Sequence, residues 1–232
     1  MDASAHPGTP SIPDRSGNSA AVASQTGRAL GRLDVAAEDA VLTAARARAD
    51  ELGCLALSPE CGAALRVLAA AMQARAVVEV GTGAGVSGLW VLRGMRPDGV
   101  LTSIDAEAEL QGAARLAFRE AGIPASRARL INGRALDVLP RLADGYYDLV
   151  LISDAPVAEY PDYLVESMRL LRPGGAVAFG GVLLGGRVAD SSARDPITAV
   201  VRDLLRTIRD HPRLTPAILP VDDGLLVAVL TA

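Results

Sequence analysis

The chain has 232 residues, half of them hydrophobic, and a formal net charge of −4. This length suits one α/β domain with a sizeable core, and no apolar run reaches the roughly 18–20 residues that span a bilayer. The acidic balance gives no electrostatic case for binding nucleic acid or an anionic membrane. The N-terminus lacks the basic-then-apolar pattern of an export signal, so we expect a cytoplasmic protein.

The basic residues limit the available chemistry. All 23 are arginine, so no reaction step can use a lysine base. The only histidines, His6 and His211, argue against a His-based catalytic triad or a His-rich metal site. Cys54 and Cys61 lack zinc-type spacing, and we expect small buried hydrophobic side chains there.

The N-terminal quarter divides into a tail and two helices. Residues 1–27 are rich in Ser, Ala, Gly and Pro with no hydrophobic period, which predicts a disordered or loosely docked tail before a domain at 28–232. Apolar spacing predicts a helix over 38–52. Ser58-Pro59 has the composition of an N-cap followed by the first residue of a second helix.

The central feature is an apolar strand, 77–80, followed by glycines at alternate positions, 81, 83 and 85, and then by a helical pattern from Val86. A parallel strand that turns sharply into a helix needs glycine, because the turn requires positive φ and leaves no room for Cβ. The turn brings backbone N–H groups and a helix N-terminus close to a ligand. This pattern predicts a nucleotide- or nucleoside-binding turn.

A second apolar run, 100–104, ends in Asp105, where a carboxylate can accept both hydroxyls of a ribose. Residues 83–88 literally match the dinucleotide pattern G-x-G-x-x-G. However, the glycines of the dinucleotide pattern should begin where the strand ends. The first strand ends at Val80, so the turn opens at Gly81, before the match begins at Gly83. The spacing therefore predicts a nucleoside site and argues against, without excluding, a nicotinamide cofactor.

Strands and helices alternate along the rest of the chain, and a hairpin signal, Asp222-Asp223-Gly224, lies near its end. This order predicts an α/β, Rossmann-like fold: a central, mostly parallel sheet with helices on both faces and a C-terminal antiparallel hairpin. The expected helices are 107–121, a short one ending at 142, 160–171 and 196–210; the expected strands are 128–131, 147–152, 176–179, 215–221 and 225–230.

From about Asp39 to its end, the chain resembles the class I S-adenosylmethionine (SAM)-dependent O-methyltransferases of the catechol and caffeoyl-CoA type, which include many bacterial members. The motifs that carry the resemblance occur in the expected order. They are Ser58-Pro59-Glu60 with Gly62, Glu79 through Ser87, Asp98-Gly99, Ala121-Gly122-Ile123, Tyr147 through Val150, Leu170 through Gly175, and Asp223-Gly224-Leu225. The resemblance implies a methyltransferase fold, SAM as cofactor, a small-molecule acceptor, and a homodimer with the hairpin and N-terminal helices at its interface.

The resemblance also implies a set of SAM-binding residues. Glu79 and Gly81 would lie near the methionine end, Ser87 near its carboxylate, and Asp105 at the ribose. Arg134 stands where the family usually has an acidic residue beside the adenine. The full implied set is Glu79, Gly81, Thr82, Gly83, Gly85, Ser87, Asp105, Gly133, Arg134, Ala135 and Asp154.

The reaction centre departs from the family pattern. Family members bind a divalent cation through an Asp after the fourth strand and an Asp-Asn pair after the fifth, with a nearby Lys as general base. Counting back from Tyr160 puts Asp154 at the first metal position, whereas counting forward from Asp148 puts Ser153 there. Val157 replaces the Lys, and Gly180-Gly181 replace the Asp-Asn pair.

One Asp and two glycines make a poor site for Mg²⁺ or Ca²⁺, which prefer several oxygen ligands. We therefore expect a weakened or lost metal site in which Asp154 is the remaining candidate ligand. Without a metal, a side chain would have to deprotonate the acceptor, and the candidates are Asp154, Glu159, Asp162 and Asp190.

The sequence thus predicts SAM-dependent methyl transfer, most simply to a hydroxyl of a small molecule. Two alternatives stay open. The missing Lys and Asp-Asn pair would also fit a protein of the same fold that binds SAM or S-adenosylhomocysteine (SAH) without turnover. The pattern at 83–88 would fit a nicotinamide-dependent oxidoreductase, although no Tyr-Lys or His catalytic pair is available.

Overall fold

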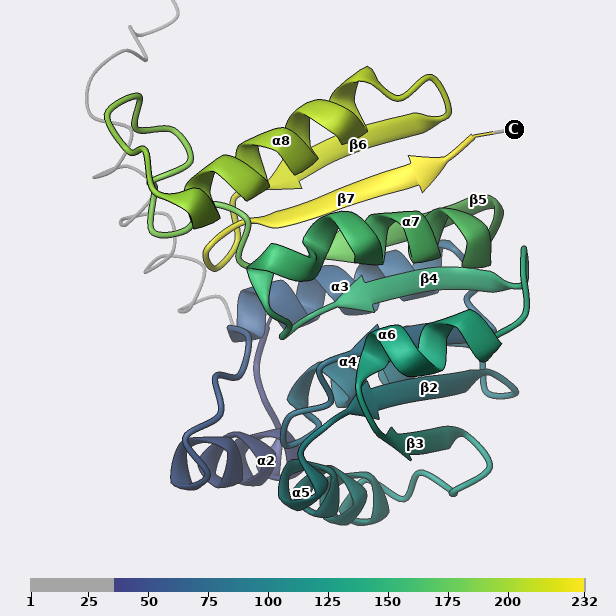
Figure 1. Cartoon of the computed structure of the whole chain (residues 1–232). Helices are drawn as coiled ribbons and strands as arrows, with labels where there is room; N and C mark the ends of the chain where they lie inside the picture. The colour runs from purple at the N-terminus through teal and green to yellow at the C-terminus, as the bar shows by residue number, and fades with distance from the viewer. Residues whose placement is uncertain (1–35, 232) are drawn as a thin grey trace, which may run out of the picture. The chain divides into compact units, whose positions relative to one another are not determined.

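The computed structural model describes residues 36–231, and its compact unit begins at Glu38. The tail predicted at 1–27 lies outside the described residues. Seven strands form one sheet in the order β3-β2-β1-β4-β5-β7-β6, confirming the predicted mostly parallel sheet with a C-terminal antiparallel hairpin (Figure 1). The strands are β1 (Ala76–Val80), β2 (Val100–Asp105), β3 (Ala128–Asn132), β4 (Tyr147–Ile152), β5 (Leu171–Phe179), β6 (Leu214–Leu219) and β7 (Leu225–Leu230).

Helices cover both faces of the sheet. The helices are α2 (Ala40–Glu51), α3 (Pro59–Ala71), α4 (Val86–Gly94), α5 (Ala108–Glu120), α6 (Ala135–Val138), α7 (Tyr160–Leu170) and α8 (Pro196–Asp210). One apolar core joins the sheet to α6, α7 and α8, which lie in front of the sheet in Figure 1, and a second joins it to α2, α3, α4 and α5. Val78 and Val80 contribute to the first core and Val77 to the second, as the period of two in a strand requires.

Two predicted boundaries were wrong. Strand β5 begins at Leu171 rather than at 176, because Leu171 already pairs with Tyr147 before the register shifts to Leu149–Ala176. The segment Arg172-Pro173-Gly174-Gly175, whose composition is typical of a turn, is therefore part of the strand. Strand β6 ends at Leu219 rather than at 221, because the backbone turns at Asp222, where φ is +53°.

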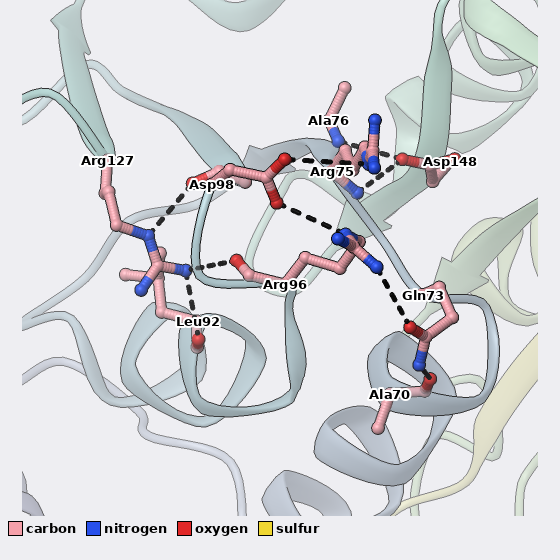
Figure 2. Close-up of polar contacts among 10 residues, drawn as sticks. Ala70, Gln73, Arg75, Ala76, Leu92, Arg96, Asp98, Arg127 and Asp148 are labelled. Atoms are coloured by element: carbon pink, nitrogen blue, oxygen red, sulfur yellow. Dashed lines mark hydrogen bonds and ion pairs between the residues drawn. The ribbon is translucent and has the colours of Figure 1, made fainter.

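A polar network links the amino ends of the central strands β1 and β4 (Figure 2). Asp148 accepts hydrogen bonds from the backbone N–H groups of Arg75 (2.6 Å) and Ala76 (2.8 Å), and from Nε of Arg172 (2.6 Å). One carboxylate therefore joins three neighbouring strands, β1, β4 and β5. Arg127 donates to the carbonyls of Gly99 and Arg96, which fixes the loop between α4 and β2.

This network occupies one end of the parallel strands, so the opposite, carboxyl end is left for ligands, as is usual in open α/β sheets. Within residues 36–231, no helix has both the length and the apolar character needed to cross a membrane.

Candidate active site

The turn after β1 requires glycine at its first position. The N–H of Gly81 donates to the carbonyl of Ile104 (2.9 Å), and its φ is +87°. A Cβ at Gly81 would overlap the backbone of Asp154, which passes directly beside it. The glycine therefore allows the loop after β4 to lie against the turn after β1, and this contact places Asp154.

Asp105 lies at the end of β2, as predicted, and faces the glycine turn. Its Oδ2 accepts a hydrogen bond from the N–H of Gly83 (3.0 Å), and its Oδ1 accepts one from the N–H of Glu107 (2.8 Å). Each carboxylate oxygen keeps a second lone pair, so both can still accept a ribose hydroxyl. The geometry fits the role that the sequence predicts for Asp105.

A first cavity of about 460 Å³ opens beside Asp105. The residues that line it include Gly81, Asp105, Gly133, Arg134, Ala135, Asp154, Glu159 and Tyr163. The guanidinium of Arg134 pairs with Glu159 (2.7 Å), and the Tyr163 hydroxyl donates to the other oxygen of Glu159 (2.8 Å). Arg134 therefore lines the cavity with its charge neutralised, and the backbone of 133–135 remains available to a ligand.

A second cavity of only about 20 Å³ lies between the glycine turn and the loop at 54–57. Thr82, Gly83, Ser87 and Cys54 line it, and a Cβ at Gly83 would lie 3.0 Å from Sγ of Cys54. This volume holds about one water molecule. The loop therefore covers the part of the turn that contains Ser87.

A third cavity of about 350 Å³ lies where β4, β5 and the β6–β7 turn meet. Its walls are mostly apolar, and its polar lining includes Asp154, Tyr160, Asp222 and Asp223. Asp154 lines all three cavities, so it is the junction of the site.

Asp154, rather than Ser153, has a free side chain at this junction. The Ser153 hydroxyl donates to backbone carbonyls of Val80 (3.1 Å) and Gly81 (2.7 Å), so it holds the loop in place. The Asp154 carboxylate accepts no hydrogen bond from residues 36–231. Burial, and then the negative charge of Asp105, raise the pKa of Asp154 above its usual value. A carboxylate with a raised pKa is a better proton acceptor.

The other candidate bases are placed less favourably. Glu159 lines the first cavity but is held by Arg134 and Tyr163. Asp190 accepts hydrogen bonds from its neighbour Ser192, and Asp162 lies exposed on α7. None of the three lines the third cavity.

Two residues of the predicted cofactor set do not line these cavities. Glu79 is fully buried and faces the α3–α4 side of the sheet, as Val77 does. Its Oε2 accepts from the Ser103 hydroxyl (2.6 Å), which in turn lies 2.7 Å from the Thr82 hydroxyl. Burial raises the pKa of Glu79 to about 7, opposed by the Ser103 and Ser87 hydroxyls. Glu79 thus stabilises the glycine turn from within the core, through Ser103 and Thr82.

Gly85 is the second such residue. It is the N-cap of α4, with φ of +91°, and a Cβ there would lie 3.0 Å from Cα of Ala114 in α5. Gly85 therefore allows two helices to pack closely, while Gly81 and Gly83 line the cavities.

A divalent cation does not fit the residues present. Gly180 and Gly181 line the third cavity where side-chain ligands would be needed. In the described part of the chain, no three His, Cys, Asp or Glu side chains are grouped to hold a metal ion.

The sequence placed Asp222 and Asp223 in a hairpin turn, and Asp223 in a motif shared with the family, but assigned neither to the site. Because β7 runs antiparallel to β5, with Leu226 opposite Phe179, the start of β7 lies at the carboxyl end of β5. The predicted hairpin therefore already implied that its turn would reach the ligand end of the sheet.

The sheet order, the antiparallel final strands, and a glycine turn facing an acidic strand end define a class I methyltransferase. The family model described as O-methyltransferase matches residues 36–230. The chain therefore belongs to the SAM-dependent O-methyltransferase family, and the predicted family and enzyme class are confirmed.

Individual proteins agree with this assignment. A protein of Mycobacterium sp. (strain JLS), named "Putative O-methyltransferase", is 56% identical over 191 residues, covering 82% of this chain and 86% of its own. The crystal structure of a Corynebacterium glutamicum protein has a TM-score of 0.82 at 33% identity, covering 89% of this chain and 98% of that one. The O-methyltransferase TomG from Streptomyces achromogenes, solved with SAM, has a TM-score of 0.77 at 32% identity, covering 84% and 92%.

Proposed function

We propose that this enzyme transfers a methyl group from SAM to a hydroxyl oxygen of a small molecule in the third cavity, without the divalent cation used by catechol-type relatives. The observation that carries the proposal is the position of Asp154, which lines both the first and the third cavity. A group there can reach a methyl donor on one side and a methyl acceptor on the other.

The first cavity suits the adenosine part of SAM. Asp105 would accept the ribose hydroxyls, and the backbone at 133–135 would flank the adenine. The methionine part would enter the second cavity, towards Ser87 and Thr82. Since that cavity is too small for it, the loop at 54–57 must move outwards when SAM binds.

Asp154 would act as the general base. Bound SAM supplies an electrophilic methyl group on a sulfonium. Asp154 orients the acceptor hydroxyl and takes its proton as the oxygen–carbon bond forms and the carbon–sulfur bond breaks, with the electron pair leaving on sulfur. The raised pKa of Asp154 brings it closer to the pKa of a hydroxyl group and so favours this proton transfer.

The direct test is Asp154→Asn, which keeps the shape but cannot take the proton. We expect kcat to fall about 100-fold or more, while SAH affinity measured by calorimetry changes little. Asp162→Asn, an exposed carboxylate outside the third cavity, is the matched control and should behave like the unmodified enzyme. Equal loss of SAH binding and activity in Asp154→Asn would mean that Asp154 only supports the cofactor site.

Val157 stands where the family has a Lys, and Gly180 and Gly181 stand where it has an Asp-Asn pair. These differences favour one alternative, a protein that binds SAM or SAH without turnover. Both functions require SAH binding, so calorimetry cannot separate them. Transfer of a radioactive methyl group to any member of a hydroxyl-compound library would exclude the alternative.

We also propose a homodimer. β6 is the edge of the sheet, and Ile218 (43% exposed) and Leu219 (37% exposed) present apolar surface there. An exposed apolar edge strand favours pairing with another chain. Light scattering with size-exclusion chromatography should give twice the chain mass of 23.9 kDa. Ile218→Glu should return the monomer mass if this edge forms the interface.

A further inference from the structure

The third cavity is lined by an excess of acidic side chains. Among residues 36–231, Asp154, Asp222 and Asp223 line it and no arginine does. Arg46 lies close by, because it donates to the carbonyl of the lining residue Ala56 (3.5 Å), but its guanidinium is held by Glu38 through two hydrogen bonds of 2.8 and 2.6 Å. Its charge is therefore already neutralised, and a ligand in the cavity meets a negative potential.

The carboxylates have capacity left for a ligand. Asp222 accepts a hydrogen bond from the N–H of Ser58 (2.9 Å) through Oδ2, and Asp223 accepts one from the N–H of Gly185 (2.8 Å) through Oδ1. These bonds fix the two side chains and leave the other oxygen of each without a partner within residues 36–231. Both side chains are therefore oriented, and each can accept further hydrogen bonds.

Two observations indicate that these carboxylates act on the same ligand as Asp154. Asp154 and Asp223 line one cavity together with the buried Tyr160, whose hydroxyl donates to the carbonyl of Gly180 (3.1 Å), and both charges contribute to the raised pKa of Tyr160. The same cavity has apolar walls that include Leu57, Leu65 and Leu225. An apolar cavity with a few convergent polar groups is the usual form of a small-molecule site.

A metal ion does not explain the acidic lining. Among the described residues, these three carboxylates are not grouped closely enough to hold one metal ion. An organic cation has its charge at the end of a molecular frame, so it can reach Asp222 or Asp223 while another part of the same molecule lies against Asp154.

We propose that the methyl acceptor carries a protonated amine, with its hydroxyl at Asp154 and its ammonium group at Asp222 and Asp223. This inference rests on the proposed function. An ammonium group donates three charge-assisted hydrogen bonds, which matches the free carboxylate oxygens. Acceptors with a carboxylate or phosphate group are disfavoured, because the described residues that line the cavity include no cation to pair with them.

The test compares three phenols of similar size whose side chains end in ammonium, methyl or carboxylate: tyramine, 4-propylphenol and 3-(4-hydroxyphenyl)propanoate. Binding to the SAH-loaded enzyme is measured by calorimetry, with MgCl₂ alone as a further ligand. We expect tyramine to bind about tenfold or more tightly than 4-propylphenol, and the carboxylate to bind most weakly.

The variant Asp222→Asn/Asp223→Asn removes the charges while retaining the acceptor oxygens that bond Ser58 and Gly185. In this variant the preference for tyramine should fall to within about threefold, with SAH affinity unchanged. Asp203→Asn, an exposed carboxylate on α8, is the control and should keep the preference.

The outcomes separate this inference from the proposed function. Equal binding of the three phenols, no binding of tyramine, or a Mg²⁺ site that needs Asp222 or Asp223 overturns the ammonium proposal while SAH binding still supports a methyltransferase. Absence of SAH binding overturns the proposed function itself.

Discussion

Gly81 is where the glycine turn and the loop carrying Asp154 come closest. Gly81→Ala should lower the free energy of unfolding by about 2 kcal/mol or more, because φ is +87° and the added Cβ overlaps the Asp154 backbone. SAH affinity should fall as well. Gly112→Ala, on the exposed side of α5 with free space around it, should instead stabilise the protein by about 0.5–1 kcal/mol. Chemical denaturation of both variants measures the change in the free energy of unfolding, and calorimetry measures the change in SAH affinity.

Asp148 should couple stability to pH. Burial alone would raise its pKa, but the N–H groups of Ala76 and Arg75 and the Arg172 guanidinium outweigh burial and hold it below the usual value. Its stabilisation is therefore fully present above the ordinary Asp pKa of about 3.9 and is lost as the pH falls through the lower pKa of the folded state.

Asp148→Asn should cost about 1–3 kcal/mol at pH 7, because the amide cannot satisfy all the donors around it. Denaturation curves at pH 7 and at lower pH provide the measurement, and the difference from the unmodified protein should shrink only below pH 4 or so. A difference that is constant with pH would show that the charge of Asp148 contributes nothing. Asp203→Asn serves as the surface control.

At the scale of single residues, strand ends were predictable and strand interiors were harder to interpret. Asp105 follows the last residue of an apolar run, so its place at the ligand end of the sheet follows from the chain alone. Glu79 lies inside β1 and shares a face with Val77, which the period of two indicates. Its assignment to the cofactor came from the family resemblance and stays a prediction.

At the scale of elements, the loop at 54–57 is expected to respond to the cofactor. Leu55 lines the second cavity together with its neighbours but is 90% exposed, so a protease that cuts before apolar residues, such as thermolysin, has access to it. In the binding mode proposed above, SAH contacts this loop after it has opened, so we expect slower cleavage at Leu55 when SAH is bound. Adenosine, which fills only the first cavity, should give no protection. Protection by adenosine equal to that by SAH would contradict the proposed position of the methionine part.

The elements themselves followed closely from local signals. The Ser58 hydroxyl caps α3 by accepting from the N–H of Cys61 (3.2 Å), as the Ser-Pro pair predicts. The limits of α8 and β7 agree with their apolar patterns. The start of β5 could not be predicted, because a Pro-Gly-Gly segment signals a turn and only its pairing with β4 makes it a strand.

At the scale of the whole molecule, the sequence alone showed which metal ligands of the family pattern are replaced, but it could not show which residues surround Gly180 and Gly181 in the fold. The glycines at 180 and 181 come from one loop, and the carboxylates at 222 and 223 come from another some forty residues later. Only the antiparallel insertion of β7 between β5 and β6 brings the two together around the third cavity.

This arrangement predicts that removing divalent metal leaves the enzyme unchanged. Glycine offers no side-chain ligand, and the described carboxylates are not grouped to hold one ion, so EDTA should alter neither SAH affinity nor methyl transfer. The experiment compares enzyme in EDTA with enzyme in MgCl₂, using calorimetry for SAH and radioactive methyl transfer for turnover. Loss of transfer in EDTA that magnesium restores would contradict the prediction, and Asp154→Asn would then show whether Asp154 is a ligand of that ion.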